Sequence, residues 1–442
     1  MRILAYVHGY LPVHNAGAEY ALHGVLAWLA ARGHTVTVYA PERSAAGVYD
    51  GVTVITETHG VTELFRAHDL VITHLDYTSR CIETAHRADI PVVHYAHNHR
   101  QLKYHNVDRQ DVALLMLCAD WLRAEFAWVA NMAVVNPPID AARYRVPAPG
   151  DAVTLVNLCP AKGGELFWQL AARLPEVPFL GVRGSYGRQV IPSTLPPNGR
   201  CVGNTPDIRE IYAQTRIILM PSDYESFGRV AMEAAASGIP TIAAPTPGLR
   251  ECLGDAGTFV ELDNVDGWER AIRALLDPDA YRAAALAARA RFDAFTLESD
   301  AQLLHVEGLL AQVPAAYQRA PVTTNRYEAR RNILLRGRLY RGPQHGRPGE
   351  TIRETDLDAG QRERLLRNGG MRPLAQDPAP VAPIAPAAPV APVTPEPVTP
   401  DAPAASVGMT RSALNALAAA RGITAPERLP NKAAVLAALA AI

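Results

Sequence analysis

Short apolar runs alternate with stretches of helical period from residue 2 to about residue 315. Such alternation is typical of βαβ units and parallel sheets. In the first half it predicts helices over about Ala18–Ala31 and Thr78–His86, and strands at Arg2–His8, Thr35–Tyr39, Asp69–His74, Pro91–Ala96 and Met132–Val135. The sequence Asn136-Pro-Pro138 then interrupts the pattern.

The alternation resumes in a second half. It predicts strands at Ala152–Asn157, Arg216–Met220 and Pro240–Ala243, and helices over about Gly267–Leu276, Ala280–Phe292 and Leu297–Ala311. A chain of 442 residues also exceeds what one hydrophobic core usually serves. We therefore predict an α/β protein with two Rossmann-like domains, residues 1–145 and 146–315, that face a cleft.

The pattern changes after residue 315, where we predict three further segments. Residues 316–375 form a small basic module, with eight arginines between Arg319 and Arg347 and a polar, helix-like stretch over 358–368. Residues 376–403 contain ten prolines, and so predict an extended, semi-rigid linker. Residues 404–442 have apolar positions that suit two short helices around a loop.

Composition excludes several classes of protein. The formal net charge of -1 gives no global attraction to nucleic acid or anionic membrane. Five scattered cysteines without a Cys-x-x-Cys pair predict neither a disulfide framework nor a zinc site, and they suit a reducing cytoplasm. The N-terminus predicts a buried strand and no signal peptide. No apolar run reaches about 18 residues, so we expect no membrane span.

The most informative segment is Met220–Pro240, in which a strand, a turn containing Gly228 and a helix follow one another. Open α/β sheets bind ligands just beyond the carboxyl ends of strands. Backbone amides of Phe227, Gly228 and Arg229 would open the helix, where unpaired donors favour a diphosphate. Glu233, about one and a half turns further, would accept hydrogen bonds from a ribose diol. The alternative is a surface turn with incidental acids.

This segment, followed by Pro245-Thr-Pro-Gly-Leu-Arg-Glu251, resembles the retaining GT-B glycosyltransferases of family four, the group 1 glycosyl transferases. The resemblance covers roughly residues 1–315. It implies that Glu225 lies beside the donor sugar, that Phe227 and Gly228 present amides to that sugar, and that Glu233 holds the ribose.

A lysine after the first strand of the second half predicts a diphosphate contact. Lys162, one of three lysines in the chain, precedes two glycines and a helix, like the family's Lys-Gly element. The family usually has an arginine five residues earlier, where this chain has Asn157. Arg183 or Arg188 would have to supply that charge. The alternative is an ordinary surface lysine.

Two features of the first half resemble the same family. Gly17 at the first βα turn would let the backbone approach the donor phosphates, although a plain helix start explains it too. His97, after the strand Pro91–Ala96, takes the place of the family's histidine and would bond the transferred sugar. A three-histidine metal site with His94 and His99 is the rival, but no carboxylate accompanies these residues.

These features predict a glycosyltransferase. It would move a sugar from a nucleotide-diphosphate sugar to an unidentified acceptor, and stabilise the departing diphosphate by charge. The resemblance to the family implies that the transfer proceeds with retention. We expect no cofactor and no metal, because no Asp-x-Asp follows a strand; the acids of Asp277-Pro-Asp279 suit a turn and helix cap. Asn157 motivates the alternative of a binding protein that keeps the fold without the chemistry.

The C-terminal segment bears on the acceptor. Residues 414–423 and 429–436 resemble the small helical SAP and LEM-like modules, often appended to phage-encoded proteins. Such modules bind DNA or protein; the alternative is a plain interaction domain or a tail that becomes ordered only on binding. The resemblance implies a phage protein in the host cytoplasm as one expectation. The acceptor would be a glycan, a lipid-linked sugar, a phage structural protein or DNA.

Overall fold

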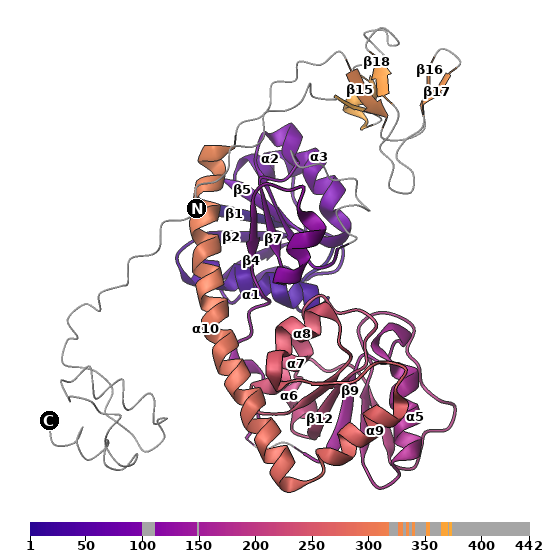
Figure 1. The fold of residues 1–442 in the computed structure, drawn as a ribbon. Coiled ribbons are helices and arrows are strands. Elements are labelled where there is room, and N and C mark those ends of the chain that lie inside the picture. The colour runs from indigo at the N-terminus through magenta and orange to yellow at the C-terminus, as the bar shows by residue number, and fades with distance from the viewer. Residues whose placement is uncertain are drawn as a thin grey trace, which may run out of the picture. The chain divides into compact units, whose positions relative to one another are not determined.

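The computed structural model describes residues 1–99, 111–147 and 150–317. It also describes the short segments 326–329, 333–335, 338–340, 351–353, 364–369 and 371–373. All of these fall within one unit of the chain, Met1–Ala387, and Figure 1 shows the fold of their elements. The predicted linker 376–403 and helical module 404–442 fall outside the described residues.

The N-terminal half is built on an eight-stranded sheet with the order β3-β4-β2-β1-β5-β6-β7-β8. Every neighbouring pair is parallel except β3 and β4. Its strands are β1 (Arg2–Tyr6), β2 (Thr35–Tyr39), β3 (Gly47–Tyr49), β4 (Val52–Ile55), β5 (Leu70–Thr73), β6 (Val92–Ala96), β7 (Leu114–Leu117) and β8 (Met132–Val134). Its helices are α1 (Gly17–Ala31), α2 (Val61–Arg66) and α3 (Thr78–Ala88), with 3-10 turns η1 (Leu75–Tyr77), η2 (Asp120–Phe126) and η3 (Ala141–Arg143).

The second half has a six-stranded parallel sheet with the order β11-β10-β9-β12-β13-β14. Its strands are β9 (Ala152–Val156), β10 (Phe179–Val182), β11 (Gly199–Val202), β12 (Thr215–Met220), β13 (Thr241–Ala243) and β14 (Thr258–Phe259). Its helices are α5 (Gly164–Arg173), α6 (Arg209–Tyr212), α7 (Arg229–Ala235), α8 (Pro247–Leu253) and α9 (Val265–Ala274), with η4 (Pro160–Lys162) and η5 (Gly254–Ala256). The prediction of an α/β fold with two Rossmann-like sheets is confirmed.

One helix corrects the sequence prediction. Ala280–Phe292 and Leu297–Ala311 are parts of a single 39-residue helix, α10 (Pro278–Ala316). A continuous stripe of buried residues at helical spacing explains why it does not break, namely Ala288, Phe292, Phe295, Ser299, Leu303, Val306, Leu310 and Val313. The side chain of Asp277 caps its start by accepting from the amides of Asp279 and Ala280, as the sequence predicts.

Helix α10 joins the two halves. It packs on α7 of the second half and on α1 and β8 of the first, and Figure 1 shows it running alongside both. Near its C-terminal end the carboxylate of Glu307 accepts from Arg32 at 2.7 Å and lies 2.9 Å from the ring of His34. The predicted helix Leu297–Ala311 therefore packs on the N-terminal half.

The sequence missed several short strands. β7 (Leu114–Leu117) and β10 (Phe179–Val182) are buried throughout, and four apolar residues in a row do not distinguish a buried strand from part of a helix. β3, β4, β11 and β14 lie toward the sheet edges and are shorter or more exposed. The core strands with longer apolar runs were placed within about two residues.

Within the predicted basic module the described backbone forms two small sheets. One has the order β18-β15-β19, and β16 pairs with β17. Their bounds are β15 (Arg326–Ala329), β16 (Ile333–Leu335), β17 (Arg338–Tyr340), β18 (Thr351–Arg353) and β19 (Met371–Pro373). Residues 364–367 are helical, inside the stretch for which the sequence predicts a helix. Among the described residues, no helix is long and apolar enough to cross a membrane.

Candidate functional site

The candidate site of the second half lies where the strand order of its sheet reverses. β10 flanks β9 on one side and β12 flanks it on the other, so β9 and β12 bound the switch point. Open parallel sheets bind ligands in the crevice beyond the carboxyl ends of such strands. Lys162 follows β9 and Glu225 follows β12, so the topology brings the two loops to one crevice.

Two glycines fix the loop that carries Lys162. Gly163 has φ 82°, in the left-handed region, and a Cβ there would lie 2.4 Å from the carbonyl oxygen of Pro221. A Cβ on Gly164 would lie 2.2 Å from the carbonyl oxygen of Leu158. Gly163 is therefore required for the loop after β9 to lie against the loop after β12, and Gly164 is required for that loop to pack on its own first residues.

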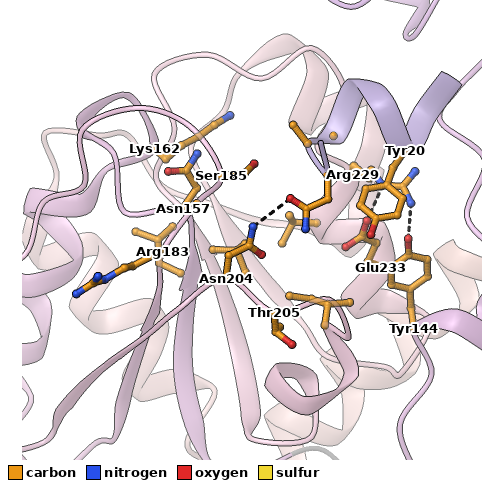
Figure 2. Close-up of a pocket in the computed structure, with 18 of the residues that line it drawn as sticks. Tyr20, Tyr144, Asn157, Lys162, Arg183, Ser185, Asn204, Thr205, Arg229 and Glu233 are labelled. Carbon is orange, nitrogen blue, oxygen red and sulfur yellow. Dashed lines mark hydrogen bonds and ion pairs between the residues drawn. The ribbon is translucent and has the colours of Figure 1, made fainter. Parts of the chain in front are cut away.

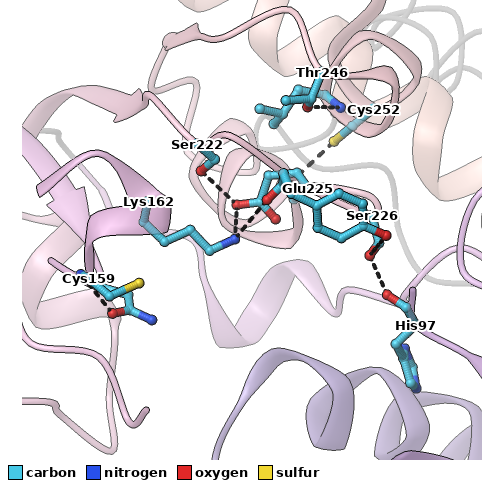
Figure 3. Close-up of polar contacts among 12 residues, drawn as sticks. His97, Cys159, Lys162, Ser222, Glu225, Ser226, Thr246 and Cys252 are labelled. Atoms are coloured by element: carbon cyan, nitrogen blue, oxygen red, sulfur yellow. Dashed lines mark hydrogen bonds and ion pairs between the residues drawn. The ribbon is translucent and has the colours of Figure 1, made fainter. Parts of the chain in front are cut away.

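Lys162 and Glu225 form an ion pair (Figure 3). The Lys162 Nζ lies 2.5 Å from Glu225 Oε1, and the hydroxyl of Ser222 donates to the same oxygen at 3.0 Å. Burial alone would lower the pKa of the Lys162 ammonium, but the Glu225 carboxylate outweighs it, and the pKa lies above its ordinary value. Lys162 is therefore a fixed positive charge in the crevice.

Glu233 lies deeper in the same crevice, paired with a cation (Figure 2). Its Oε1 lies 2.6 Å from the Arg229 Nε, and Tyr212 donates a hydrogen bond to Oε2 at 2.8 Å. Burial raises the pKa of the Glu233 carboxyl, against the opposing effects of Arg229 and Tyr212. Each carboxylate oxygen keeps one further acceptor position, so the pairing leaves room for two more hydrogen bonds.

Arg229, predicted for its backbone amide, has a side chain that holds the two halves together. Its guanidinium donates to the Tyr144 hydroxyl at 2.5 Å and to the Pro138 carbonyl at 3.2 Å, both in the N-terminal half. The same guanidinium lies over the rings of Tyr20 and Tyr144. It therefore links the wall of the crevice to the other half.

A pocket of about 560 Å³ lies between the two halves. Five of the sequence-predicted residues line it: Gly17, Lys162, Glu225, Arg229 and Glu233. Further lining residues were not singled out from sequence as site residues, among them Asn15, Tyr20, Tyr144, Ser185, Tyr186, Asn204, Thr205, Asp207 and Arg209. They come from loops of mixed composition, and no local pattern in the sequence marks them.

Gly17 stands at the start of α1, at the edge of this pocket. A Cβ built on it meets nothing within 4 Å, so the backbone here faces open space. The adjoining Asn15 accepts a hydrogen bond at 3.2 Å from the side-chain amide of Asn204 in the second half. The first βα turn of one half thus meets a loop of the other at the pocket.

Phe227 and Gly228 are not among the residues that line the pocket. The ring of Phe227 is buried against Phe295 of α10, with ring centroids 5.6 Å apart. Gly228 has φ 106° and caps α7, and a Cβ there would lie 2.6 Å from the Leu249 side chain. In this structure both residues shape the turn that carries Glu225.

Asn157 occupies a strained position beside the pocket. It has φ 70°, and its Oδ1 accepts hydrogen bonds from the Cys159 amide and from the Gln189 side chain. A Cβ on Gly184 would lie 2.2 Å from the Asn157 side chain. The side chain is therefore held in a close-packed network and leaves little space for an arginine.

Of the two arginines predicted as substitutes for that charge, Arg183 lines the pocket and Arg188 does not. Arg183 is exposed and, within the described part of the chain, takes part in no ion pair. Lys162 and Arg229 are each paired with a glutamate, Arg209 is paired with Asp207, and Arg143 is paired with Asp50. Arg183 is thus the cation of the pocket whose charge is least neutralised by carboxylates, and this charge is available to an anionic ligand.

The ring of His97 is not among the groups that line this pocket. Its backbone carbonyl accepts a hydrogen bond from the Ser226 hydroxyl, and Figure 3 shows the ring pointing away from Glu225. The ring packs on Tyr95, with centroids 4.3 Å apart, and its Nε2 is buried without a hydrogen-bond partner among the described residues. Burial lowers the pKa of this imidazole to about 3, so the ring is neutral.

Part of the second half matches a protein family model. Residues 174–278 match the model described as glycosyl transferases group 1. This region contains β10 to β14 and both Glu225 and Glu233.

Curated relatives agree with that match. The D-inositol 3-phosphate glycosyltransferase of Mycobacterium avium is 29% identical over 203 residues, which cover 39% of this chain and 47% of the relative. The enzyme of that name from Mycobacterium marinum is 28% identical over 286 residues, or 62% of this chain and 58% of the relative. The chain thus spans about half the length of these relatives.

Solved structures extend the comparison to the whole two-domain core. The Anabaena protein HepE in complex with UDP has a TM-score of 0.57 and 17% identity, covering 72% of this chain and all of that one. Sucrose-phosphate synthase from Thermosynechococcus elongatus gives 0.57 and 18% identity, with the same coverage. At this identity the likeness concerns the fold alone. The chain has the two-domain GT-B fold, and its second half is similar to the group 1 glycosyl transferases.

Proposed function

We propose that this protein is a glycosyltransferase that takes a sugar from a nucleotide-diphosphate sugar. The observation that carries the proposal is the pocket between the halves, in which Lys162, Arg183 and Glu233 surround one crevice at the switch point of the sheet. Two cations suit a diphosphate and a buried carboxylate suits a ribose diol. The matches to glycosyl transferases group 1 support the same chemistry.

In this proposal each group has one role. Lys162 and Arg183 bind the diphosphate and stabilise the negative charge that develops on it as the bond to the sugar breaks. Glu233 accepts hydrogen bonds from the ribose. Glu225 lies beside the sugar and orients Lys162, to which it is paired at 2.5 Å. Gly17 lets the backbone of the first half approach the donor from the opposite side.

In this proposal the His97 ring turns toward the pocket and contacts the transferred sugar. Its carbonyl already bonds Ser226, next to Glu225. Retention of configuration is part of the proposal and rests on the family resemblance.

Donor binding in this proposal needs no metal ion, because Lys162 and Arg183 supply the positive charge that a cation would otherwise supply. Calorimetric titration with the nucleotide diphosphate in EDTA, and again with added Mg²⁺ or Mn²⁺, tests this step. Equal affinity is expected. Binding that occurs only with added metal would contradict it.

The acceptor is proposed only by class. A glycan, a lipid-linked sugar, a protein or DNA all remain candidates, and the segment 404–442 would recruit it as a small protein- or DNA-binding module. Location in the cytoplasm, including that of a phage host, also stays a prediction.

The first experiment is a panel of nucleotide sugars, with UDP-glucose among them, scored by donor hydrolysis and by protection against thermal unfolding. At least one donor should be hydrolysed. The rival proposal, a binding protein without chemistry, is favoured by Asn157 in place of arginine. Protection by a donor that is never consumed, with any acceptor offered, would support the rival and overturn the enzyme.

A matched pair of variants tests the charge assignment. Arg183→Ala should weaken diphosphate binding by roughly 10-fold or more, since a hydrogen bond to a charged group contributes about 1.5–3 kcal/mol. Arg188→Ala removes the same charge five residues away, outside the pocket, and should bind as wild type. Equal losses of diphosphate affinity in Arg183→Ala and Arg188→Ala would indicate a general electrostatic effect and no specific contact with Arg183.

A further inference from the structure

The N-terminal sheet has a switch point of its own, and buried histidines gather there. β1 is flanked by β2 on one side and by β5 on the other, so β1 and β5 bound the crevice. His8 follows β1 and His74 follows β5 directly. Because parallel neighbours end at the same edge, the topology brings the two imidazoles together.

A carboxylate from α1 completes the group. Glu19 is in the first turn of that helix, and its Oε1 lies 3.9 Å from His8 Nε2 and 3.6 Å from His14 Nε2. Single donor atoms of His8, Glu19 and His74 all lie within 4.8 Å of one another. His14 stands beside them, with its ring centroid 5.3 Å from that of His8.

These groups are buried without the partners that buried polar groups normally have. Glu19 is 1% exposed and His74 is fully buried. Neither oxygen of Glu19, neither ring nitrogen of His74 and not the Nδ1 of His8 forms a hydrogen bond within the described chain. Five such atoms in one place are costly, because a buried polar group normally has a partner and a buried carboxylate needs a cation.

We propose that His8, Glu19 and His74 bind a divalent transition-metal ion, with Zn²⁺ as the best fit, and that His14, which lies outside that 4.8 Å group, turns in as the fourth ligand. Two or three imidazoles with one carboxylate are a ligand set of such ions. Ligand atoms around tetrahedral Zn²⁺ stand about 3.4 Å apart, close to the separations from Glu19 to His14 and His8. The same separations are too long for direct hydrogen bonds.

The protonation of the cluster agrees with this assignment. Burial keeps the pKa values of His8, His14 and His74 below their ordinary value, so the imidazoles are neutral, as metal ligands must be. Burial raises the pKa of the Glu19 carboxyl to about 7, and a cation would remove that penalty. His14 is partly exposed and gives the ion a path from solvent.

The ion would fasten the turn between β1 and α1 to the edge of the sheet. That turn carries Asn15 and Gly17 to the donor pocket, so the site supports one wall of the pocket without contacting the donor. It is separate from the proposed donor chemistry, which uses Lys162 and Arg183.

The test uses the full chain, stripped with EDTA and titrated with Zn²⁺ by calorimetry, followed by metal analysis after gel filtration. About one Zn²⁺ per chain should be retained, with a rise in melting temperature. Glu19→Gln keeps the shape of the side chain and should abolish both effects. His59→Ala removes an exposed histidine of the same half and should leave both unchanged.

Substitution at a buried position can also impair folding, so His14→Ala at the rim of the cluster is measured in parallel. Zn²⁺ affinity should fall by more than about 10-fold. Removing a metal ligand lowers the affinity more than removing a residue that only hydrogen-bonds to a ligand. Co²⁺ added to the wild-type chain should give an absorption spectrum that Glu19→Gln lacks. Failure of the wild-type chain to retain Zn²⁺, or equal binding by the wild-type, Glu19→Gln and His14→Ala chains, overturns the site.

Discussion

The Nζ of Lys162 lies 2.5 Å from the Oε1 of Glu225, although 63 positions separate the two residues in the chain. Both side chains are largely buried, with 17% and 14% of their surfaces exposed. A donor diphosphate would therefore meet a lysine whose direction is already fixed by a carboxylate. That arrangement has consequences that can be measured separately for stability and for binding.

Lys162→Met should destabilise the protein by up to about 3 kcal/mol, because it leaves the Glu225 carboxylate without its partner. It should also weaken nucleotide-diphosphate binding by roughly 10- to 100-fold. The double variant Lys162→Met with Glu225→Gln should regain most of the stability and none of the affinity. Urea unfolding and calorimetry separate the two effects. Wild-type affinity in Lys162→Met would remove the lysine from the donor site.

Glu233→Gln tests the ribose contact with little change of shape. The amide oxygen can still accept from Tyr212, but the charge that strengthens hydrogen bonds to a diol is lost, so nucleotide affinity should fall by about 1–2 kcal/mol. Inorganic pyrophosphate has no ribose and should bind to the variant and the wild type equally. A parallel loss for pyrophosphate would show that Glu233 acts on the phosphates or on the fold.

Glu233→Ala is a poorer test, for a reason visible only in the structure. Glu233 is paired with the Arg229 guanidinium at 2.6 Å, and removing the carboxylate strands a buried cation. The cost to stability should be about 3–5 kcal/mol. Glu233→Gln also removes the charge but keeps an acceptor for Tyr212, so the melting temperature should fall in both variants and further in Glu233→Ala. A wild-type melting temperature in both variants would argue against a strong pair.

His97 should make the fold sensitive to acid. Its pKa is about 3 in the folded chain and about 6.5 when unfolded, so the unfolded chain binds the proton first as pH falls. Its contribution to stability is present above pH 6.5 and is lost as pH falls toward 3. The loss between pH 7 and 4 should be about 3 kcal/mol, less than the full shift implies because the folded chain does not take up the proton until the pH nears 3.

The control for that prediction is His97→Phe, which keeps a ring against Tyr95 and cannot titrate. Urea unfolding at pH 7 and pH 4 should show a smaller loss of stability in the variant than in the wild type. The same loss in both chains would mean that His97 already holds its proton when folded or that other groups govern the acid response.

The segment 376–442 should contribute to location or acceptor choice and not to donor chemistry. Its proline-rich beginning cannot form a packed core, so removing the segment should leave the melting temperature and donor hydrolysis essentially unchanged. Transfer to the natural macromolecular acceptor should fall, because tethering raises local concentration. Loss of donor binding in the truncated chain would show that the segment belongs to the active site.

Much of the fold follows from local pattern. β2 begins and ends where the alternation predicts, and α1 and β6 differ from their predictions by one residue. The sequence predicts two helices in place of α10, because the polar Asp293 and Thr296 weaken the apolar pattern. In the structure Phe292 and Phe295 continue the buried stripe. That continuity depends on packing against both halves, which a local window does not contain.

The candidate site also has a part that follows from local sequence and a part that depends on tertiary packing. Lys162, Glu225 and Glu233 were found because glycines and a strand–turn–helix order mark their loops. The pairing of Glu233 with Arg229 and the burial of the His97 ring were not predicted, since rotamers and neighbours decide them. The metal cluster was missed because His8, Glu19 and His74 lie apart in sequence and match no ligand spacing.

The sequence by itself determined the α/β alternation, the loops that follow β9 and β12 and the residue types that suit a diphosphate and a ribose. Only the tertiary structure decided which of those side chains face the pocket, which are neutralised by a partner and which are buried without one. Hydrophobic period and glycine positions specify the backbone of each segment. Electrostatic pairing and burial depend on distances between segments far apart in the chain, and these are set when the two sheets pack.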